Sequence, residues 1–121
     1  MADFTLDHPR GSASGDFGGL VPVQGHGSVT RDGVTHRWDF RARHTGWTLA
    51  IGPEHAEIKG YVHDGDAVWG AGGEWGEWPE AGYMPDATVT AILRDTLTRY
   101  LDGEVSWEAP GDLHMVEAPN G

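Results

Sequence analysis

The dipeptide Asp32-Gly33 separates two stretches of alternating polar and apolar residues. A two-residue hairpin of type I′ needs positive φ at both central positions, and Asp-Gly tolerates this conformation well. Such a turn would place Arg31 opposite Val34 in neighbouring strands. The sequence therefore predicts an antiparallel sheet, because a tight turn joins strands that run in opposite directions.

A second tight turn is expected at Thr45-Gly46, where it would place His44 opposite Trp47. Since side chains of a strand alternate between faces, six apolar residues would then share one face of the sheet. They are Trp38, Phe40, Ala42, Trp47, Leu49 and Ile51. The opposite face would carry an exposed row of mixed charge, formed by Arg37, Asp39, Arg41 and Arg43.

Other parts of the chain are less regular. A further hairpin is expected around Asp64-Gly65, with strands over residues 56–63 and 66–71, and a last strand over residues 104–108. Residues 1–24 are expected to form a flexible or loosely docked arm, because a glycine- and serine-rich stretch precedes the first alternating pattern. An edge strand built from the apolar residues of this stretch is the alternative.

One helix is expected over about residues 85–102. Pro85 suits its first turn, where the missing N–H costs nothing, and Asp86 favours the positive end of the helix dipole. Gly103 provides the stop. Residues spaced by three and four form one apolar stripe. They are Val89, Ile92, Leu93, Thr96, Leu97, Tyr100 and Leu101.

These elements predict an α+β fold, an antiparallel β-meander of about five or six short strands with one C-terminal amphipathic helix packed on one face. We expect a single domain over residues 25–109 and a tail over residues 110–121. The chain of 121 residues has no cysteine, so packing alone must stabilise its core. It shows no membrane-spanning stretch or signal-peptide pattern, so we expect a soluble, cytoplasmic protein.

The net charge of −11 is concentrated in one half of the chain. Residues 1–53 carry five acidic side chains and five arginines, whereas residues 54–121 carry fourteen acidic and three basic side chains. Such a field repels nucleic acid and attracts basic partners. The alternative is that the charge serves solubility alone.

Patterns typical of enzymes are scarce. Gly11–Gly15 contains serines but not the G-x-S-x-G spacing, and Gly70–Gly76 lacks both the P-loop lysine and the dinucleotide-binding spacing. The seven histidines are scattered, and the best metal candidates are His63, Asp64 and Asp66. Because Asp-Gly is also what a tight turn requires, we expect neither a metal nor a cofactor.

The most unusual feature is the segment Trp69–Tyr83, in which aromatic residues and glutamates alternate in glycine-rich sequence. Indole and phenol rings are enriched in binding hot spots, and acidic neighbours suit a partner rich in arginine or lysine. The alternative is that the rings fold back on the sheet as a lid. The candidate partner-binding residues are Glu74, Trp75, Glu77, Trp78, Glu80 and Tyr83.

The leading functional hypothesis is a non-catalytic, acidic binding protein. It would dock on a basic, nucleic-acid-binding partner as an inhibitor that imitates nucleic acid, and would bind neither nucleic acid nor membranes directly. Small acidic inhibitors such as anti-CRISPR and immunity proteins have this general composition, and the analogy covers composition alone. One alternative is a small histidine/carboxylate enzyme with a metal near His63, and another is a sugar-binding module that uses Trp75, Trp78 and Tyr83.

Overall fold

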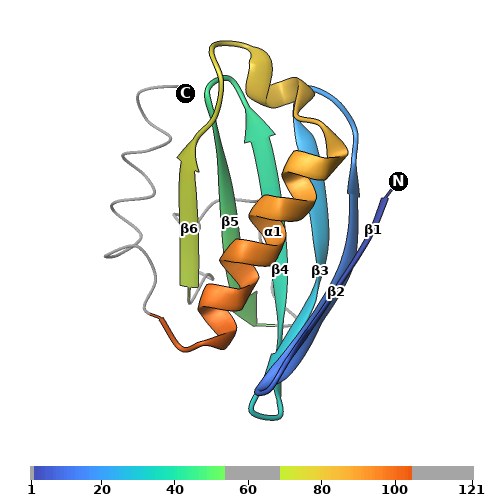
Figure 1. Ribbon diagram of the computed structural model, residues 1–121, viewed down its shortest axis with the longest axis vertical. Helices are drawn as coiled ribbons and strands as arrows, with labels where there is room; N and C mark the ends of the chain where they lie inside the picture. Colours follow the sequence, from blue (N-terminus) through green and yellow to red (C-terminus); the bar gives the residue numbers. More distant parts are fainter. Residues whose placement is uncertain (1, 54–68, 105–121) are drawn as a thin grey trace.

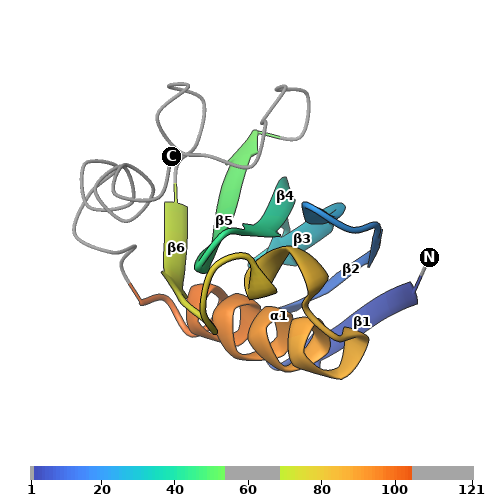
Figure 2. The ribbon, with the colours of Figure 1, turned by 90° about the horizontal axis from the view of Figure 1, so that it is seen from above.

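The computed structural model describes residues 2–53 and 69–104. Within these ranges six strands form one antiparallel sheet in chain order, and one helix crosses one face of it (Figures 1 and 2). The elements are β1 (Ala2–His8), β2 (Gly11–Gly18), β3 (Val23–Arg31), β4 (Val34–Arg43), β5 (Gly46–Pro53), β6 (Trp69–Glu74), the 3₁₀ helix η2 (Glu80–Tyr83) and α1 (Asp86–Leu101). The predicted α+β meander with its C-terminal helix is confirmed.

The first predicted hairpin is confirmed in its register. Arg31 pairs with Val34 across the turn between β3 and β4. Both turn residues adopt positive φ, 52° at Asp32 and 84° at Gly33. This is the conformation that makes Asp-Gly a hairpin dipeptide.

The predicted register of the second hairpin is wrong by two residues. Strand β4 ends at Arg43 and β5 begins at Gly46, so the turn between them is His44-Thr45 rather than Thr45-Gly46. Both turn carbonyl groups accept backbone hydrogen bonds from a later part of the chain, at 2.8 Å from the N–H of Trp75 and 3.2 Å from that of Ala81. Contacts remote in sequence thus accompany the observed turn, and local turn chemistry does not reveal them.

A shift of two residues leaves each side chain on its original face, because the strand period is two. The six apolar side chains predicted to share one face therefore do so, and all contribute to the core, with Trp47 half-buried. The charged row on the opposite face differs from expectation. Its members are half-buried rather than exposed, and Arg37 pairs with Asp39 at 3.0 Å.

The prediction of a flexible or loosely docked N-terminal arm is wrong, because residues 2–18 form β1 and β2. The two strands pair along their whole length, from Ala2 opposite Phe17 to His8 opposite Gly11. Glycine in β2 serves packing rather than flexibility. A Cβ atom on Gly15 would lie only 2.7 Å from the Cζ2 atom of the buried Trp38 ring, so glycine gives this indole its place in the core.

Helix α1 matches its prediction closely. It begins after Pro85 and is followed by Asp102 and by Gly103, whose φ is 87°. The predicted stripe is buried against the inner face of the sheet, except for the half-buried Ile92. At the C-terminal end of the helix, Asp102 contacts His8 of β1 at 2.7 Å, which ties α1 to the sheet. Neither α1 nor η2 has the length and apolar character needed to cross a membrane.

Some predicted elements lie outside the described residues. These include the turn at Asp64-Gly65, the strand over residues 56–63, nearly all of the strand over 104–108, and the tail over 110–121. The predicted strand over 66–71 overlaps β6, which pairs with β5 as far as Glu74. The first part of the glycine-rich segment is therefore a strand and not a loop.

Candidate functional site

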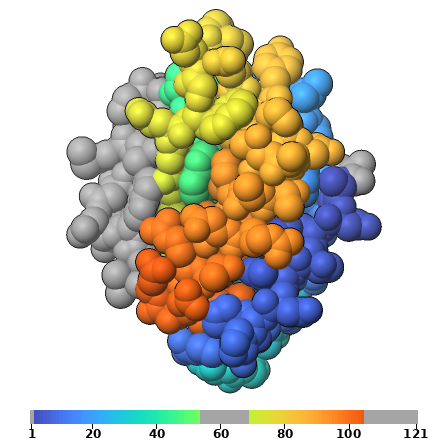
Figure 3. Space-filling view, viewed as in Figure 1, coloured from blue at the N-terminus to red at the C-terminus, as the bar shows by residue number. Residues whose placement is uncertain are grey.

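Exposed apolar side chains gather at one end of the molecule. Leu20, Val21, Trp78 and Tyr83 expose 66%, 52%, 68% and 55% of their surface, respectively, and we refer to these four residues as the aromatic tip. Two come from the loop between β2 and β3, and two from the segment that precedes α1. Figure 3 shows these two parts of the chain together at the top of the molecule, in light blue and in yellow to orange.

Backbone hydrogen bonds join the parts of the chain that form the aromatic tip. The N–H of Val21 donates to the carbonyl group of Gly82 at 2.8 Å. A Cβ atom on Gly82 would approach Val21 to 3.2 Å, so the two segments are closely packed. Because Trp75 and Ala81 also bond to the turn between β4 and β5, three separate loops brace one another. Backbone hydrogen bonds between these loops therefore hold the aromatic tip in place.

The tryptophans of the candidate segment have different environments. Trp69 is buried, donates its indole N–H to the Glu104 carbonyl group at 2.8 Å, and packs edge-on against Tyr100. Trp75 is half-buried against the core. Trp78 instead projects from the surface. The lid alternative thus describes Trp69 and Trp75, whereas the exposure expected of a binding residue is found at Trp78 and Tyr83.

One edge of the exposed Trp78 ring is fixed. Its Nε1–H donates to Nδ1 of His44, over 3.1 Å. An indole nitrogen can only donate, so His44 Nδ1 accepts through its lone pair. This hydrogen bond orients an otherwise solvent-facing ring, which lowers the entropy that Trp78 would lose on binding a partner.

The candidate segment contains three glutamates, and all three are exposed: Glu74, Glu77 and Glu80. Glu80 also has a structural task, because its carboxylate accepts the backbone N–H of Glu77 at 2.6 Å. This bond closes the turn that follows Gly76, which adopts a φ of 68°. Glu80 thus shapes the segment as well as charging it, while Glu74 ends β6.

The metal candidates His63, Asp64 and Asp66 lie outside the described residues. Within residues 2–53 and 69–104, His, Asp and Glu form no group of three that could hold a metal ion. The serines of Gly11–Gly15 belong to strand β2, where they sit on the face opposite α1.

Sequence reasoning missed two sets of residues. Leu20 and Val21 join the aromatic tip from a distant loop, and no local pattern signals that contact. The second set lines a hollow on the outer face of β2, β3 and β4, formed by Ser14, Gly15, Asp16, His26, Gly27, Ser28 and Arg37. Alternation of polar residues with glycine and alanine in β2 was the available signal, since it marks a polar strand face.

Comparison with protein-family models, with curated proteins and with solved structures finds no match for this chain.

Proposed function

We propose that this protein is a non-catalytic binding protein that docks through its aromatic tip on a basic partner protein. The supporting observation is the exposure of Trp78, a ring that is held in place by His44 and lies at the end of the molecule where the other residues of the aromatic tip are also exposed. Contiguous exposed apolar surface on a soluble domain marks interaction sites, and tryptophan is the residue most enriched in binding hot spots.

The charge around the tip defines the chemistry of the partner. Glu74 and Glu77 are exposed and precede Trp75 and Trp78 in the sequence, and the chain as a whole carries a net charge of −11. Carboxylates pair with arginine and lysine, and an indole face attracts guanidinium groups. A basic surface with an apolar recess for Trp78 meets both requirements.

A basic surface of this kind is typical of proteins that bind nucleic acid. If the glutamates near the aromatic tip occupied this basic surface, the phosphates of nucleic acid could no longer bind there. The proposed activity is therefore inhibition of a nucleic-acid-binding protein by imitation of its ligand.

The test compares variants of the tagged full chain in affinity capture from nuclease-treated lysate of the source cells. Trp78→Ala should lose the proteins that the wild type retains, because the anchor ring is gone. Val34→Ala is the matched control: Val34 is 57% exposed but lies at the other end of β4. It should retain the same proteins.

Charge provides the second arm of the test. The double variant Glu74→Lys/Glu77→Lys should lose the same proteins as Trp78→Ala, and a labelled nucleic acid should compete with the wild type for the purified partner. Unchanged capture by both tip variants, with unfolding midpoints like that of the wild type, would refute the proposal. Capture without competition would refute the nucleic-acid imitation alone.

A further inference from the structure

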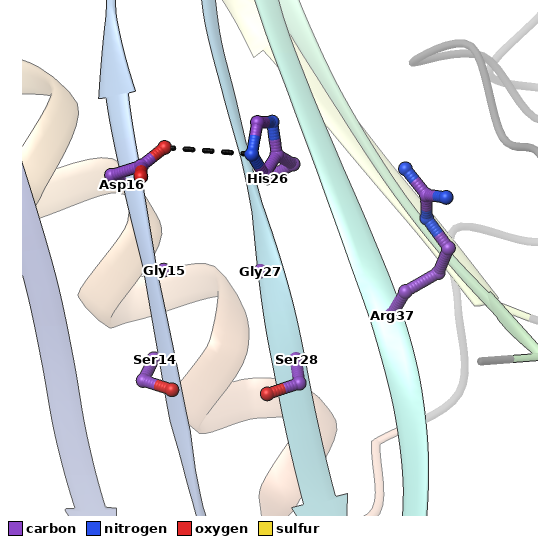
Figure 4. A pocket seen from close by; sticks show the side chains of 7 residues that line it. All are labelled: Ser14, Gly15, Asp16, His26, Gly27, Ser28 and Arg37. Carbon is purple, nitrogen blue, oxygen red and sulfur yellow. Dashed lines mark ion pairs between the residues drawn. The ribbon is translucent and has the colours of Figure 1, made fainter. Parts of the chain in front are cut away.

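A second candidate site lies on the sheet face opposite α1, away from the aromatic tip. Here β2, β3 and β4 form an open hollow of about 590 Å³. Asp16 pairs with His26 across the strands, and Ser14 pairs with Ser28 in the neighbouring row. Figure 4 shows the four side chains at the corners of a rectangle, with Arg37 at its side. From strand geometry this rectangle measures about 4.8 Å by about 6.6 Å.

The hollow contains a hydrogen-bond acceptor without a donor. Oδ1 of Asp16 is buried and has no hydrogen-bond partner, and Nε2 of His26, with which it forms an ion pair when the imidazole is protonated, is 3.6 Å away (Figure 4). That separation exceeds a hydrogen bond. The Asp16 side chain as a whole is 39% exposed, so its carboxylate group is accessible to an O–H or N–H donor of a ligand, and such a hydrogen bond would stabilise it.

The other groups of the hollow complement this acceptor. The hydroxyl groups of Ser14 and Ser28 both donate and accept, and the His26 imidazole has two ring nitrogens that form hydrogen bonds. Arg37 is bonded to Asp39, at 3.1 Å from Nε and 3.3 Å from Nη2 to the two carboxylate oxygens. Among the residues that line the hollow, Asp16 and Arg37 carry opposite charges, so neither sign dominates there.

This combination excludes several ligand classes. An anionic ligand such as phosphate would face the carboxylate of Asp16, and an organic cation would face the guanidinium group of Arg37. Binding of a divalent cation is not favoured, because the described residues offer no group of three ligating side chains. What remains is a neutral ligand with many hydroxyl groups, each able to donate to Asp16 or to exchange hydrogen bonds with the serines.

We propose that this hollow binds a neutral saccharide, with one sugar ring over the rectangle formed by Ser14, Asp16, His26 and Ser28. Two adjacent ring hydroxyls donate to the carboxylate of Asp16, and the imidazole of His26 contacts the same side of the ring. Hydroxyls on the other side of the ring reach the two serines. The rectangle spans about the width of one pyranose ring, so a single residue of a glycan fills it.

The test is an NMR titration of the ¹⁵N-labelled full chain with glucose, galactose and mannose, and with inorganic phosphate as the contrasting probe. At least one hexose should cause saturable shifts in the amide signals of residues 14–16 and 26–28. Asp16→Asn keeps the size of the side chain and should weaken binding about tenfold or more, because the charged acceptor is lost. Asp7→Asn, an exposed carboxylate on β1, is the matched control and should leave the affinity unchanged.

Three outcomes would overturn this inference. The first is the absence of saturable shifts in these amides with all three hexoses. The second is a shift pattern centred on Trp78 and Tyr83, which would place sugar binding at the aromatic tip instead. The third is phosphate binding at the hollow as tight as hexose binding. None of these results depends on docking by the tip, since Trp78→Ala should bind the hexose as the wild type does.

Discussion

The ring of Trp38 packs at Gly15 of β2, which pairs with Gly27 of β3. Its indole N–H donates to the Ser14 carbonyl group at 3.2 Å, and the ring meets Phe4 edge-on at 6.1 Å. Gly15 leaves space that this large ring occupies, and Gly27, which pairs with it, is closely approached by the backbone of β2. In this sheet an absent side chain is a packing feature, because any Cβ atom would displace the backbone or the ring.

We therefore predict that Gly27→Ala lowers the free energy of unfolding. Its new Cβ atom would lie 1.9 Å from the Ser14 carbonyl oxygen, so the strands must move apart. Overpacking of this kind costs about 1–3 kcal/mol, which urea denaturation would resolve. The neighbouring, exposed Ser28→Ala is the control and should change stability by less than about 0.5 kcal/mol. Equal effects of the two substitutions would contradict this account of Gly27.

Single residues also show where sequence reasoning stops. Asp32-Gly33 encodes its turn locally, and the turn was predicted with its register. Trp75 and Trp78 stand in similar acidic, glycine-rich surroundings in the sequence, yet one packs against the core and the other projects from the surface. That difference depends on the distant turn at His44-Thr45, so exposure could not be predicted from the segment itself.

At the scale of elements, two hairpins join at one end of the sheet. Arg10, in the turn between β1 and β2, donates its side chain to the Asp32 carboxylate and accepts the Asp32 N–H at its carbonyl oxygen. The side-chain hydrogen bond from Arg10 lowers the pKa of Asp32. Both groups are exposed, so solvent screening keeps the contribution of the pair small.

The lowered pKa gives a pH-dependent prediction with a defined sign. A carboxylate whose pKa is lower in the folded state stabilises the fold above its ordinary pKa, and this stabilisation disappears as acid protonates it. Asp32→Asn removes the charge but suits the same turn, since Asn-Gly is also a type I′ pair. The urea midpoints of wild type and variant should therefore converge as pH falls from about 5 to about 3. A constant difference over that range would show that the ion pair does not contribute.

The elements differ in how well the sequence predicts them. Helix α1 follows from its 3.6-residue apolar stripe and from Pro85 and Gly103 at its ends, all of them local signals. Strand β2 escaped prediction because glycine occupies inner positions, and a glycine-rich strand has the composition of a loop. Strand β1 contains no glycine, and it was missed together with the strand that it pairs with. The register of β4 with β5 was missed by two residues, yet the buried face was right because alternation fixes the face independently of the turn.

At the scale of the whole molecule, nineteen acidic and eight basic side chains must be held in one small fold. Net charge of this size destabilises the compact state through self-repulsion, and salt screens it over about 8 Å at physiological ionic strength. We predict that NaCl raises the urea midpoint between low and physiological ionic strength. A falling midpoint would mean that attractive pairs such as Arg10–Asp32 outweigh the repulsion.

The aromatic tip is formed only when the whole chain has folded, because its residues come from two distant loops. Val21 meets Gly82 across some sixty positions of sequence, as the hydrogen bond between them shows. The glutamates and rings of the candidate segment could be singled out from composition, but their apolar neighbours from the other loop could not. The outer hollow was missed for the same reason, since its four corners come from two strands whose pairing was not predicted.

The chain-order sheet also bears on how the protein is made. Each strand pairs with the strand synthesised just before it, so hairpins can form one after another during translation, with little loop-closure entropy to overcome. Helix α1 reaches back to β1, and its contact at Asp102 lies 94 positions from His8. Until α1 has emerged from the ribosome, the large apolar rings of the inner sheet face stay open to water. This interval is when the nascent chain most needs protection from aggregation.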